Sequence, residues 1–600
     1  MMKKRILCLV LALLMLLPLV TACSKNGKKV HIVNKGASEY TIVYSEDKNA
    51  TKDQEAATKL RNAIKDATDV KLELKTDWIN ESATEILVGK TNREATEDAL
   101  KLIRAKDFII AYDEGQVIIT GGTDEATARA VDYFIENYIN ADKKRVTVFD
   151  GGDYVGEYAY PLGDLTVAGT PLTDYTIVYP TGADKTDKIT YYIAVNLYDY
   201  ILANAGVALK MVPDSTAEAE CEILVGKTNR QQSKAVEATQ LAADEYLLFA
   251  NGKKIVMMGN SYMLGGAASA FVNKYLASKG ANAPVDAVLP TAATPEKFAF
   301  EKATSAILMV GDGMGFEHVR AGVSSGLINE FVAEKLPYKS ACVTASQSVL
   351  DGDAEYTDSA AAATALATGY KTINYYVGQN KNGQKVTNVR ELAQSKGAKT
   401  AIVTTAAITD ATPAAFLAHA GDRYDASIQT QIDKLVEEGK VDYVKGDTND
   451  LNKVTETELI NNTREALSLI SEGSNTYFAM IEEAHVDKNS HKVQSGARSL
   501  ADVQNSVACY NEVIAYAIGF VMLHPKTALI VTADHECGKV EYKESTDSYQ
   551  FKSDNHSNAD VPVFGIGDGV SELLEGKEKI DNTDIAKFIA KIYGENSFGG

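Results

Sequence analysis

Residue types that commonly act as metal ligands follow one apolar run after another in the C-terminal part of this chain. Runs such as 306–310 (AILMV) and 527–533 (TALIVTA) alternate with segments of helical pattern, which predicts an α/β fold with a mostly parallel sheet flanked by helices. The carboxyl ends of parallel strands share one edge of a sheet, so the residues after these runs are expected to converge there. The residues that follow such runs are Asp312, Asp410, Thr412, Glu482, Asp487, His491, Asp534 and His535, and His556 comes just before another run.

These residue types favour a mixed metal site. Aspartate together with histidine is what zinc takes at an open catalytic site, whereas carboxylates and a threonine hydroxyl suit magnesium. Two metal ions about 3.5–4 Å apart can hold the attacking and leaving oxygens of a phosphoryl transfer. The sequence therefore predicts a metal-dependent site for phosphate chemistry, in place of scattered and unrelated acids.

Ser359 stands at the start of an alanine-rich segment, EYTDSAAAATALATGYKT (355–372). Asp358 has the residue type of a helix N-cap, which would make Ser359 the first residue of a helix. Helix N-termini bind anions because their free N–H groups point outward, and a serine hydroxyl beside a metal ion ionises more easily. The segment therefore predicts a nucleophile on a helix whose small side chains let it approach the sheet edge closely.

The ordered motifs GDGMG, TDSAAAATALATG, DATPAA, HAGDR, VDKNSH and TADH, followed by a late histidine, resemble those of the alkaline phosphatase family over roughly residues 300–595. The resemblance implies an alkaline-phosphatase-like fold and a phosphomonoesterase in which Ser359 becomes phosphorylated. It implies that Arg423 grips the phosphate in a bidentate fork and that Asp358 orients this arginine. Lys488 matches a family variant in which a lysine reaches the phosphate through water.

The resemblance also implies the cofactors, two Zn²⁺ and one Mg²⁺. The implied ligands are Asp487, His491 and His556 for the first zinc; Asp312, Asp534 and His535 for the second zinc; and Asp312, Thr412 and Glu482 for magnesium, with Asp410 close by through water.

Two residues depart from the family pattern, and other histidines and cysteines need an interpretation. Glu483 stands where the family usually has glycine, and we expect it to point away from the magnesium group, as neighbours on a strand do. Tyr375 replaces a common glycine after Asn374, and we expect it to narrow the mouth of the pocket. We interpret Cys537 as a buried free thiol, His419 as a core histidine, and His485 as lying outside the ligand set.

The N-terminal part contains a tandem duplication. YTIVY occurs at 40–44 and 175–179, and EILVGKTNR occurs at 85–93 and 222–230, in the same order and with similar spacing. Each copy reads as a small α+β domain, which predicts domains at 38–155 and 165–293 before a catalytic domain at 300–595. The pattern resembles the N-terminal domain of α-glucuronidases. A spacer or scaffold is the favoured role, and contact with glycans stays open.

The start of the chain has the pattern of an export signal. A basic segment precedes an apolar stretch, and LVTAC resembles the lipobox of bacterial lipoproteins, which predicts a signal peptide at 1–22 and lipidation of Cys23. The alternative is an uncleaved anchor helix, for which the apolar run is short. The predicted location is the cell membrane, lipid-anchored and facing the extracellular or periplasmic side. No other segment is expected to be apolar for long enough to span a membrane.

The net charge of -20 disfavours nucleic acid as a partner, because phosphates would be repelled. The expected partners are small phosphomonoester substrates and, through the lipid anchor, a membrane, while a homodimer is left open. Two alternatives to the alkaline phosphatase interpretation remain. One is a phosphodiesterase of the same superfamily, and the other is a surface glycan-binding protein that carries a secondary phosphatase domain.

Overall fold

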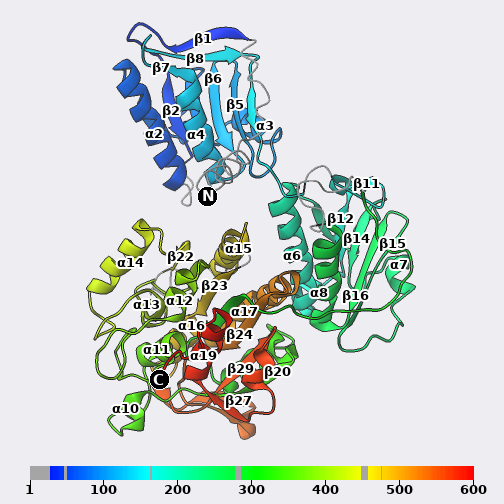
Figure 1. Cartoon of the computed structure of the whole chain (residues 1–600), viewed down its shortest axis with the longest axis vertical. Helices are drawn as coiled ribbons and strands as arrows, with labels where there is room; N and C mark the ends of the chain where they lie inside the picture. The colour runs from blue at the N-terminus through cyan, green and yellow to red at the C-terminus, as the bar shows by residue number, and fades with distance from the viewer. Residues whose placement is uncertain (1–26, 46–50, 163–164, 277–285, 448–456, 475) are drawn as a thin grey trace, which may run out of the picture. The chain divides into compact units, whose positions relative to one another are not determined.

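The computed structural model describes residues 27–45, 51–162, 165–276, 286–447, 457–474 and 476–600 (Figure 1). These residues form two compact units, of which the first holds most described residues up to Leu165 and the second most of those from Thr166 onwards. The predicted signal peptide (1–22) and the lipidation site Cys23 lie outside the described residues.

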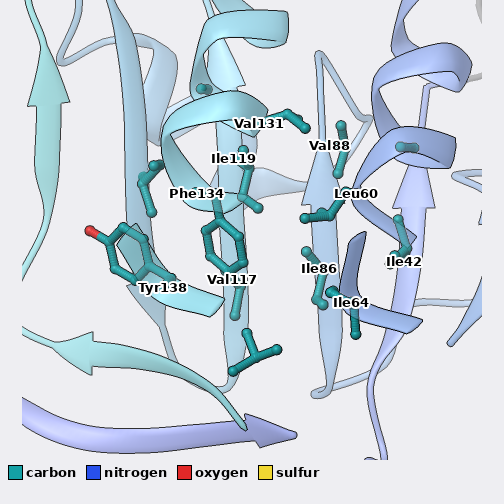
Figure 2. Close-up of a cluster of buried hydrophobic side chains, with 14 of the residues drawn as sticks. Ile42, Leu60, Ile64, Ile86, Val88, Val117, Ile119, Val131, Phe134 and Tyr138 are labelled. Carbon is teal, nitrogen blue, oxygen red and sulfur yellow. The ribbon is translucent and has the colours of Figure 1, made fainter. Parts of the chain in front are cut away.

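The first unit contains a sheet with the strand order β3-β2-β4-β6-β5-β9. The first four strands run parallel, whereas β5 is antiparallel to both of its neighbours. Figure 2 shows its core, where Ile42 and Ile86 of the sheet meet Leu60 and Phe134 of two helices. The elements are β1 (Lys28–Val33), β2 (Thr41–Tyr44), α2 (Thr51–Thr68), β3 (Glu73–Thr76), β4 (Glu85–Val88), α3 (Glu94–Leu100), β5 (Phe108–Asp113), β6 (Gln116–Gly121), α4 (Asp124–Tyr138), β7 (Ile139–Asn140), β8 (Arg145–Asp150) and β9 (Tyr154–Gly156).

The second repeat forms a sheet with the order β13-β12-β14-β16-β15-β18. Its pairings have the same parallel and antiparallel senses, position by position, as those of the first sheet. The boundaries 38–155, 165–293 and 300–595 stay predictions. Most of the second repeat lies in the same compact unit as the C-terminal sheet. The elements are β10 (Thr166–Val167), β11 (Thr170–Pro171), β12 (Thr176–Tyr179), α5 (Ala183–Thr186), α6 (Lys188–Ala205), β13 (Lys210–Pro213), β14 (Glu222–Val225), α7 (Gln231–Lys234), β15 (Glu245–Asn251), β16 (Lys254–Gly259), α8 (Leu264–Ser269), β17 (Asp286–Ala287) and β18 (Glu296–Lys297).

The repeated motif EILVGKTNR builds the same buried ion pair in both sheets. Glu85 begins β4 and accepts a hydrogen bond from Nε of Arg93 at 2.9 Å, and Glu222 begins β14 and accepts one from Nε of Arg230 at 3.0 Å. All four side chains are almost fully shielded from water. A buried carboxylate is tolerated only with such a partner, so the glutamate and the arginine keep their spacing in both copies.

The C-terminal part is an eight-stranded sheet with the order β22-β21-β23-β19-β24-β29-β20-β30 (Figure 1). Apart from β29, its strands run in one direction, and helices pack against them, which confirms the predicted α/β fold with a mostly parallel sheet. The strands are β19 (Ser305–Gly311), β20 (Tyr338–Val343), β21 (Lys399–Thr404), β22 (Tyr443–Lys445), β23 (Tyr477–Glu483), β24 (Thr527–Thr532), β29 (Val561–Ile566) and β30 (Lys579–Asp581), with β25 (Glu536–Cys537), β26 (Val540–Lys543), β27 (Ser548–Phe551) and β28 (His556–Ser557) beside the sheet.

The direction of β29 explains how a residue before a strand can reach the same edge as residues after strands. β29 is antiparallel to β24, so the start of β29 lies at the edge where β19, β23 and β24 end. His556 lies just ahead of that start and therefore belongs to this edge. The helices are α9 (Phe316–Ser324), α10 (Gln347–Leu350), α11 (Ser359–Thr368), α12 (Val389–Ser395), α13 (Ala411–Leu417), α14 (Ser427–Glu437), α15 (Thr457–Ser471), α16 (His485–Ser490), α17 (Leu500–Leu523), α18 (Val570–Leu574) and α19 (Asn582–Ile592).

One helix corrects the expectation that no further segment is apolar for long enough to span a membrane. α17 has the length and composition to do so, but most of it is buried inside the second unit. It packs on the C-terminal sheet and also contacts α8 of the second repeat. Nδ2 of Asn196, on α6, donates to the carbonyl oxygen of Tyr516 in α17 at 3.0 Å. Burial on more than one side leaves α17 little need for polar residues.

Candidate active site

Ser359 begins α11, and Asp358 caps this helix by accepting a hydrogen bond from the backbone N–H of Ala361 at 3.0 Å. All residues of α11 are buried, and the helix contacts both α13 and α19. The alanines permit this close packing because they add little volume to either face. Ser359 Oγ lies 3.0 Å from Nε2 of His535, so the helix start is held at the edge of the sheet.

Three acidic and hydroxyl groups surround Nε2 of His535. Asp312 Oδ1 and Asp534 Oδ2 each lie 3.3 Å from this nitrogen, in addition to the hydroxyl of Ser359. Neighbouring ligands of a tetrahedral zinc, with bonds of about 2.0–2.1 Å, are themselves about 3.3 Å apart. The residues predicted for the second zinc therefore come together with a spacing that fits a metal ion.

The residues predicted for the first zinc form a second group. Nε2 of His491 and Nε2 of His556 lie 3.1 Å apart, and the Asp487 carboxylate is 3.3 Å from the first and 3.4 Å from the second. Nδ1 of His491 donates to the carbonyl oxygen of Asp554, and Nδ1 of His556 donates to that of Thr357 at 2.8 Å. With Nδ1 of each ring bonded to a carbonyl oxygen, Nε2 is the nitrogen left to bind a metal ion, as in metal-binding histidines.

Buried oxygens without partners mark the same groups. In native proteins nearly every buried polar atom is hydrogen-bonded, so an exception calls for an explanation. Among the described residues, Nδ1 of His535 and four oxygens of predicted ligands lack a hydrogen-bond partner, and cations would satisfy the four oxygens. They are Asp312 Oδ1, Thr412 Oγ1, Asp487 Oδ1 and Asp534 Oδ2.

The acids of the site carry shifted pKa values, which reflect this crowding. Burial and then the Asp534 carboxylate raise the pKa of Asp312, and burial raises the pKa of Glu482 to about 8. Asp487 differs: burial acts to raise its pKa, but the hydrogen bonds from His491 and His556 outweigh burial and lower it. A cation bound among these carboxyls would displace their protons, so metal binding and protonation compete here.

The predicted magnesium ligands are only partly brought together by direct contacts. Glu482 is the penultimate residue of β23, which pairs with β19, and its Oε2 accepts a hydrogen bond from Oγ1 of Thr404. The N–H of Asp312 donates to the carbonyl oxygen of Glu483 at 2.9 Å, which keeps Asp312 next to this strand end. Thr412 lies in the first turn of α13, with its hydroxyl buried.

Asp410 has cationic partners on both carboxylate oxygens. Its Oδ2 accepts from Nζ of Lys488 and its Oδ1 from Nη2 of Arg423 at 3.1 Å. Nη1 of Arg423 also donates to Oδ2 of Asp358 at 3.4 Å. Burial acts to lower the pKa of Arg423, but Asp410 and Asp358 outweigh burial and raise it. The two carboxylates thus fix the plane of a guanidinium group that stays charged.

Glu483 is engaged outside the magnesium group. Its Oε2 accepts hydrogen bonds from the backbone N–H groups of His485 and Val486, both at 3.0 Å, at the start of α16. Its other oxygen lies 3.3 Å from Nδ1 of His485. His419, interpreted as a core histidine, contacts Glu391 Oε1 at 3.0 Å instead of any predicted ligand.

Cys537 and Thr404 belong to this region although the sequence does not assign them. Sγ of Cys537 and the ligand atoms of Asp487, His491 and His556 all lie within 4.8 Å of one another. Cys537 is indeed a buried free thiol, and the pairing of β25 with β28 places it opposite His556. That pairing joins two residues distant in sequence, so only the position of Cys537 shortly after Asp534 could have pointed to it.

Buried carboxylates, imidazoles and the serine at the start of α11 lie together at one edge of a mostly parallel sheet. These features define a metal-binding α/β domain. The alkaline phosphatase family model matches residues 303–452, so this segment of the chain is similar to that family. This match includes Asp312, Ser359 and Arg423 and ends before Glu482. The predicted ligands after residue 452 lie outside the match, and the distances given above place them beside the matched residues.

Curated proteins with sequence similarity are mainly alkaline phosphatases. Alkaline phosphatase 4 of Bacillus subtilis is 30% identical over 287 residues, which cover 39% of this chain and 61% of that protein. Alkaline phosphatase 3 of the same species is 24% identical over 317 residues, 42% of this chain and 66% of that protein. Streptomycin-6-phosphate phosphatase of Streptomyces griseus is 38% identical over 124 residues, 20% of this chain and 28% of that protein. The chain thus spans less than two thirds of the length of these relatives.

Solved structures that match about half of the chain include alkaline phosphatases. The enzyme from the Antarctic bacterium TAB5 is 22% identical, with a TM-score of 0.42, and the match covers 49% of this chain and 99% of that one. The enzyme from Thermus thermophilus is 14% identical, with a TM-score of 0.42, and the match covers 49% of this chain and 92% of that one.

Proposed function

We propose that this protein is a metal-dependent phosphomonoesterase, an alkaline phosphatase that works through a phosphoserine at Ser359. The observation that carries the proposal is the position of the Ser359 hydroxyl, 3.0 Å from Nε2 of His535 inside a group of buried ligand atoms. Arg423, held between Asp358 and Asp410, supplies the second requirement, a fixed cation for the phosphate oxygens. The names of the curated relatives support the same reaction class.

The residues of the chain divide the reaction between them. Ser359 Oγ would form a bond to phosphorus as the ester oxygen leaves, and water would later release phosphate and restore the serine. Arg423 would hold two phosphate oxygens and offset their charge in the transition state, and the N-terminus of α11 would add its free N–H groups. Bound metal ions would supply Lewis acidity, which lowers the pKa of the oxygens they hold.

The metal content is part of the proposal: two Zn²⁺ and one Mg²⁺. The group of Asp487, His491 and His556 supports one zinc, because imidazole and carboxylate ligands suit this ion. The group around His535 supports the second zinc. Glu482 and Thr412 support magnesium, because they offer only oxygen ligands. Asp410 would position Lys488 and Arg423 through its two carboxylate oxygens. It would also contact magnesium through water.

The location of the protein is also a proposal. We propose that it is anchored to the membrane by a lipid on Cys23 and faces the extracellular or periplasmic side. The support is the sequence of residues 1–23 alone, with its basic segment, apolar stretch and LVTAC motif. Replacement of Cys23 by Ser should release the protein from the membrane fraction of cells that express it.

The experiment that tests the function compares two substrates. The protein starting after Cys23, loaded with zinc and magnesium, is assayed with phenyl phosphate and with its diester counterpart, diphenyl phosphate, at alkaline pH. The proposal expects hydrolysis of the monoester with a strong preference over the diester. A preference for the diester would assign the site to the phosphodiesterases of the same superfamily.

A further inference from the structure

Two exposed tyrosines stand beside the groups that would hold phosphate. Tyr375 is 51% exposed and Tyr424 is 78% exposed, whereas Ser359 is 3% exposed. The centroids of the two tyrosine rings lie 6.4 Å apart, and the ring planes are inclined by 45°. Because a phosphate bound at Ser359 would be buried, the rest of the substrate has to extend toward solvent, where these rings lie.

Tyr375 is held in place by the same carboxylate that orients Arg423. Its backbone N–H donates to Oδ1 of Asp358 at 3.1 Å. Its φ angle is +75°, in the left-handed region that favours glycine, so a tyrosine adopts it at an energetic cost. An aromatic side chain in a conformation better suited to glycine points to a use for the ring.

Tyr424 directly follows Arg423 in the chain. The central guanidinium carbon of Arg423 lies 5.7 Å from the centroid of the Tyr424 ring, which is within the range of cation–π contacts. The ring therefore touches the phosphate-binding arginine on one side and remains open to solvent over most of its surface. Tyr375 is thus hydrogen-bonded to Asp358, and Tyr424 is in contact with Arg423. These two groups would define the position of the phosphate.

We propose that Tyr375 and Tyr424 form an aromatic platform that binds a planar aromatic ring carried by the leaving group, as in aryl phosphates and nucleoside monophosphates. This inference rests on the proposed phosphomonoesterase function and names its substrate class. Exposed aromatic rings bind flat groups by stacking, with little demand for particular hydrogen-bonding atoms. The platform would accept many such groups and would favour them over aliphatic alcohols such as glycerol.

The platform would act mainly on substrate binding. It contacts the leaving group at a distance from the reacting phosphorus, so it stabilises the bound substrate and the transition state to a similar degree. Loss of such uniform binding raises KM and leaves kcat nearly constant. A structural role for the tyrosines would instead disturb Asp358 or Arg423 and lower kcat for every substrate.

The test uses the zinc- and magnesium-loaded full-length protein with phenyl phosphate, adenosine 5′-monophosphate and glycerol 3-phosphate. The variants are Tyr424→Ala and Tyr375→Gly. Glycine suits the φ angle at 375 and keeps the N–H that bonds Asp358. For each substrate the variant is compared with the unchanged protein, so differences in intrinsic leaving-group reactivity cancel. Tyr542→Ala, which removes an exposed tyrosine on β26, is the control.

The platform predicts that kcat/KM falls about tenfold per ring for the phenyl and adenosine substrates, through KM. The loss for glycerol phosphate is expected to be several times smaller, and Tyr424→Phe should restore the values because stacking needs the ring and not its hydroxyl. Equal losses for all three substrates, or a fall in kcat alone, overturn the platform while the proposed function stands. If the unchanged protein hydrolyses none of the monoesters, the proposed function fails and the platform fails with it.

Discussion

At the scale of single residues, the nucleophile is the first assignment to test. Ser359→Ala removes the only hydroxyl that lies 3.0 Å from Nε2 of His535 among the described residues, so phosphomonoesterase activity should fall by at least about a thousandfold. The melting temperature should change little, because the helix keeps its Asp358 cap. Ser324→Ala removes a hydroxyl of α9 that bonds the carbonyl of Ala321 and none of the predicted site residues, and should keep full activity. Wild-type turnover in Ser359→Ala would exclude a phosphoserine.

Arg423→Lys should show how much the fixed fork contributes. The charge remains, but a lysine cannot bond Asp358 and Asp410 while presenting two parallel donors to a phosphate. We expect kcat/KM for phosphomonoesters to fall about a hundredfold. Steady-state kinetics of the loaded enzyme measures this loss. Near-normal kinetics in the lysine variant would mean that a positive charge at residue 423, without two parallel donors, is enough to bind the phosphate.

The acids of the site predict how stability of the metal-free protein depends on pH. Burial raises the pKa of Glu482 to about 8 and that of Asp534 to about 7. The folded state thus binds these protons more tightly than the unfolded state, whose carboxyl pKa values are about 4. Their contribution to stability is fully present below about pH 4 and is lost as the pH rises through about 7–8.

Thermal unfolding with a chelator should therefore show a falling melting temperature between about pH 4 and about pH 8. Protein loaded with zinc and magnesium should change less, since bound cations replace the protons. Calorimetry of both forms at several pH values measures the difference. A flat or rising melting temperature of the chelated protein would contradict the raised pKa values of Glu482 and Asp534.

At the scale of helices and strands, the sequence predicts the nature of the elements better than their direction. Apolar runs followed by acids predict strands that end at a common edge, and Asp312, Glu482 and Asp534 lie at such ends. His556 precedes its strand, and only the antiparallel pairing of β29 with β24 explains its place. Strand direction depends on a partner far away in sequence, which local patterns do not encode.

The surroundings of α17 and the partners of Asp410 also depend on residues far away in sequence, so local patterns do not predict them. The apolar length of α17 reflects burial on several sides, which depends on the second repeat packing against it. Asp410 is recognisable from its motif, but its partners Lys488 and Arg423 come from other elements. Composition and spacing therefore identify ligand types, while the pairing of charges follows from tertiary structure.

The contact between α15 and the second repeat offers a test at this scale. Arg464 donates to both oxygens of Asp199, at 3.0 and 2.7 Å, and the Tyr516 hydroxyl donates to Asp199 as well. Asp199→Ala should destabilise the second unit by about 1–2 kcal/mol, because a bidentate, partly buried pair is lost. Lys59→Ala, which breaks an exposed pair with Asp132, is the control and should change stability little. Chemical denaturation measures both.

At the scale of the whole molecule, the two repeats have the same sheet but belong to different compact units. Breaking the buried pair by Glu85→Ala leaves Arg93 buried without its carboxylate, at a cost of about 3–5 kcal/mol. Because Glu85 lies in the first unit, phosphatase activity should persist while an early unfolding step appears. Glu222→Ala should destabilise the unit that contains the active site and lower activity at elevated temperature.

Both outcomes are measured by activity after heating and by calorimetry of the two variants. Equal loss of activity in Glu85→Ala and Glu222→Ala would show that the two units unfold together. The prediction of two α+β repeats before a third domain describes the order of the chain, but it does not anticipate that the second repeat is grouped with the C-terminal sheet.

The strand order of the C-terminal sheet has a consequence for the nascent polypeptide. β20 pairs only with β29 and β30 among the described strands, so it cannot join the sheet until the ribosome has made residues 561–581. α19, which packs on the helix of Ser359, is made later still. The site therefore cannot be completed until the last segment of the chain, which contains β29, β30 and α19, has been synthesised. A chain that stalls before this segment would carry every proposed catalytic residue and remain inert.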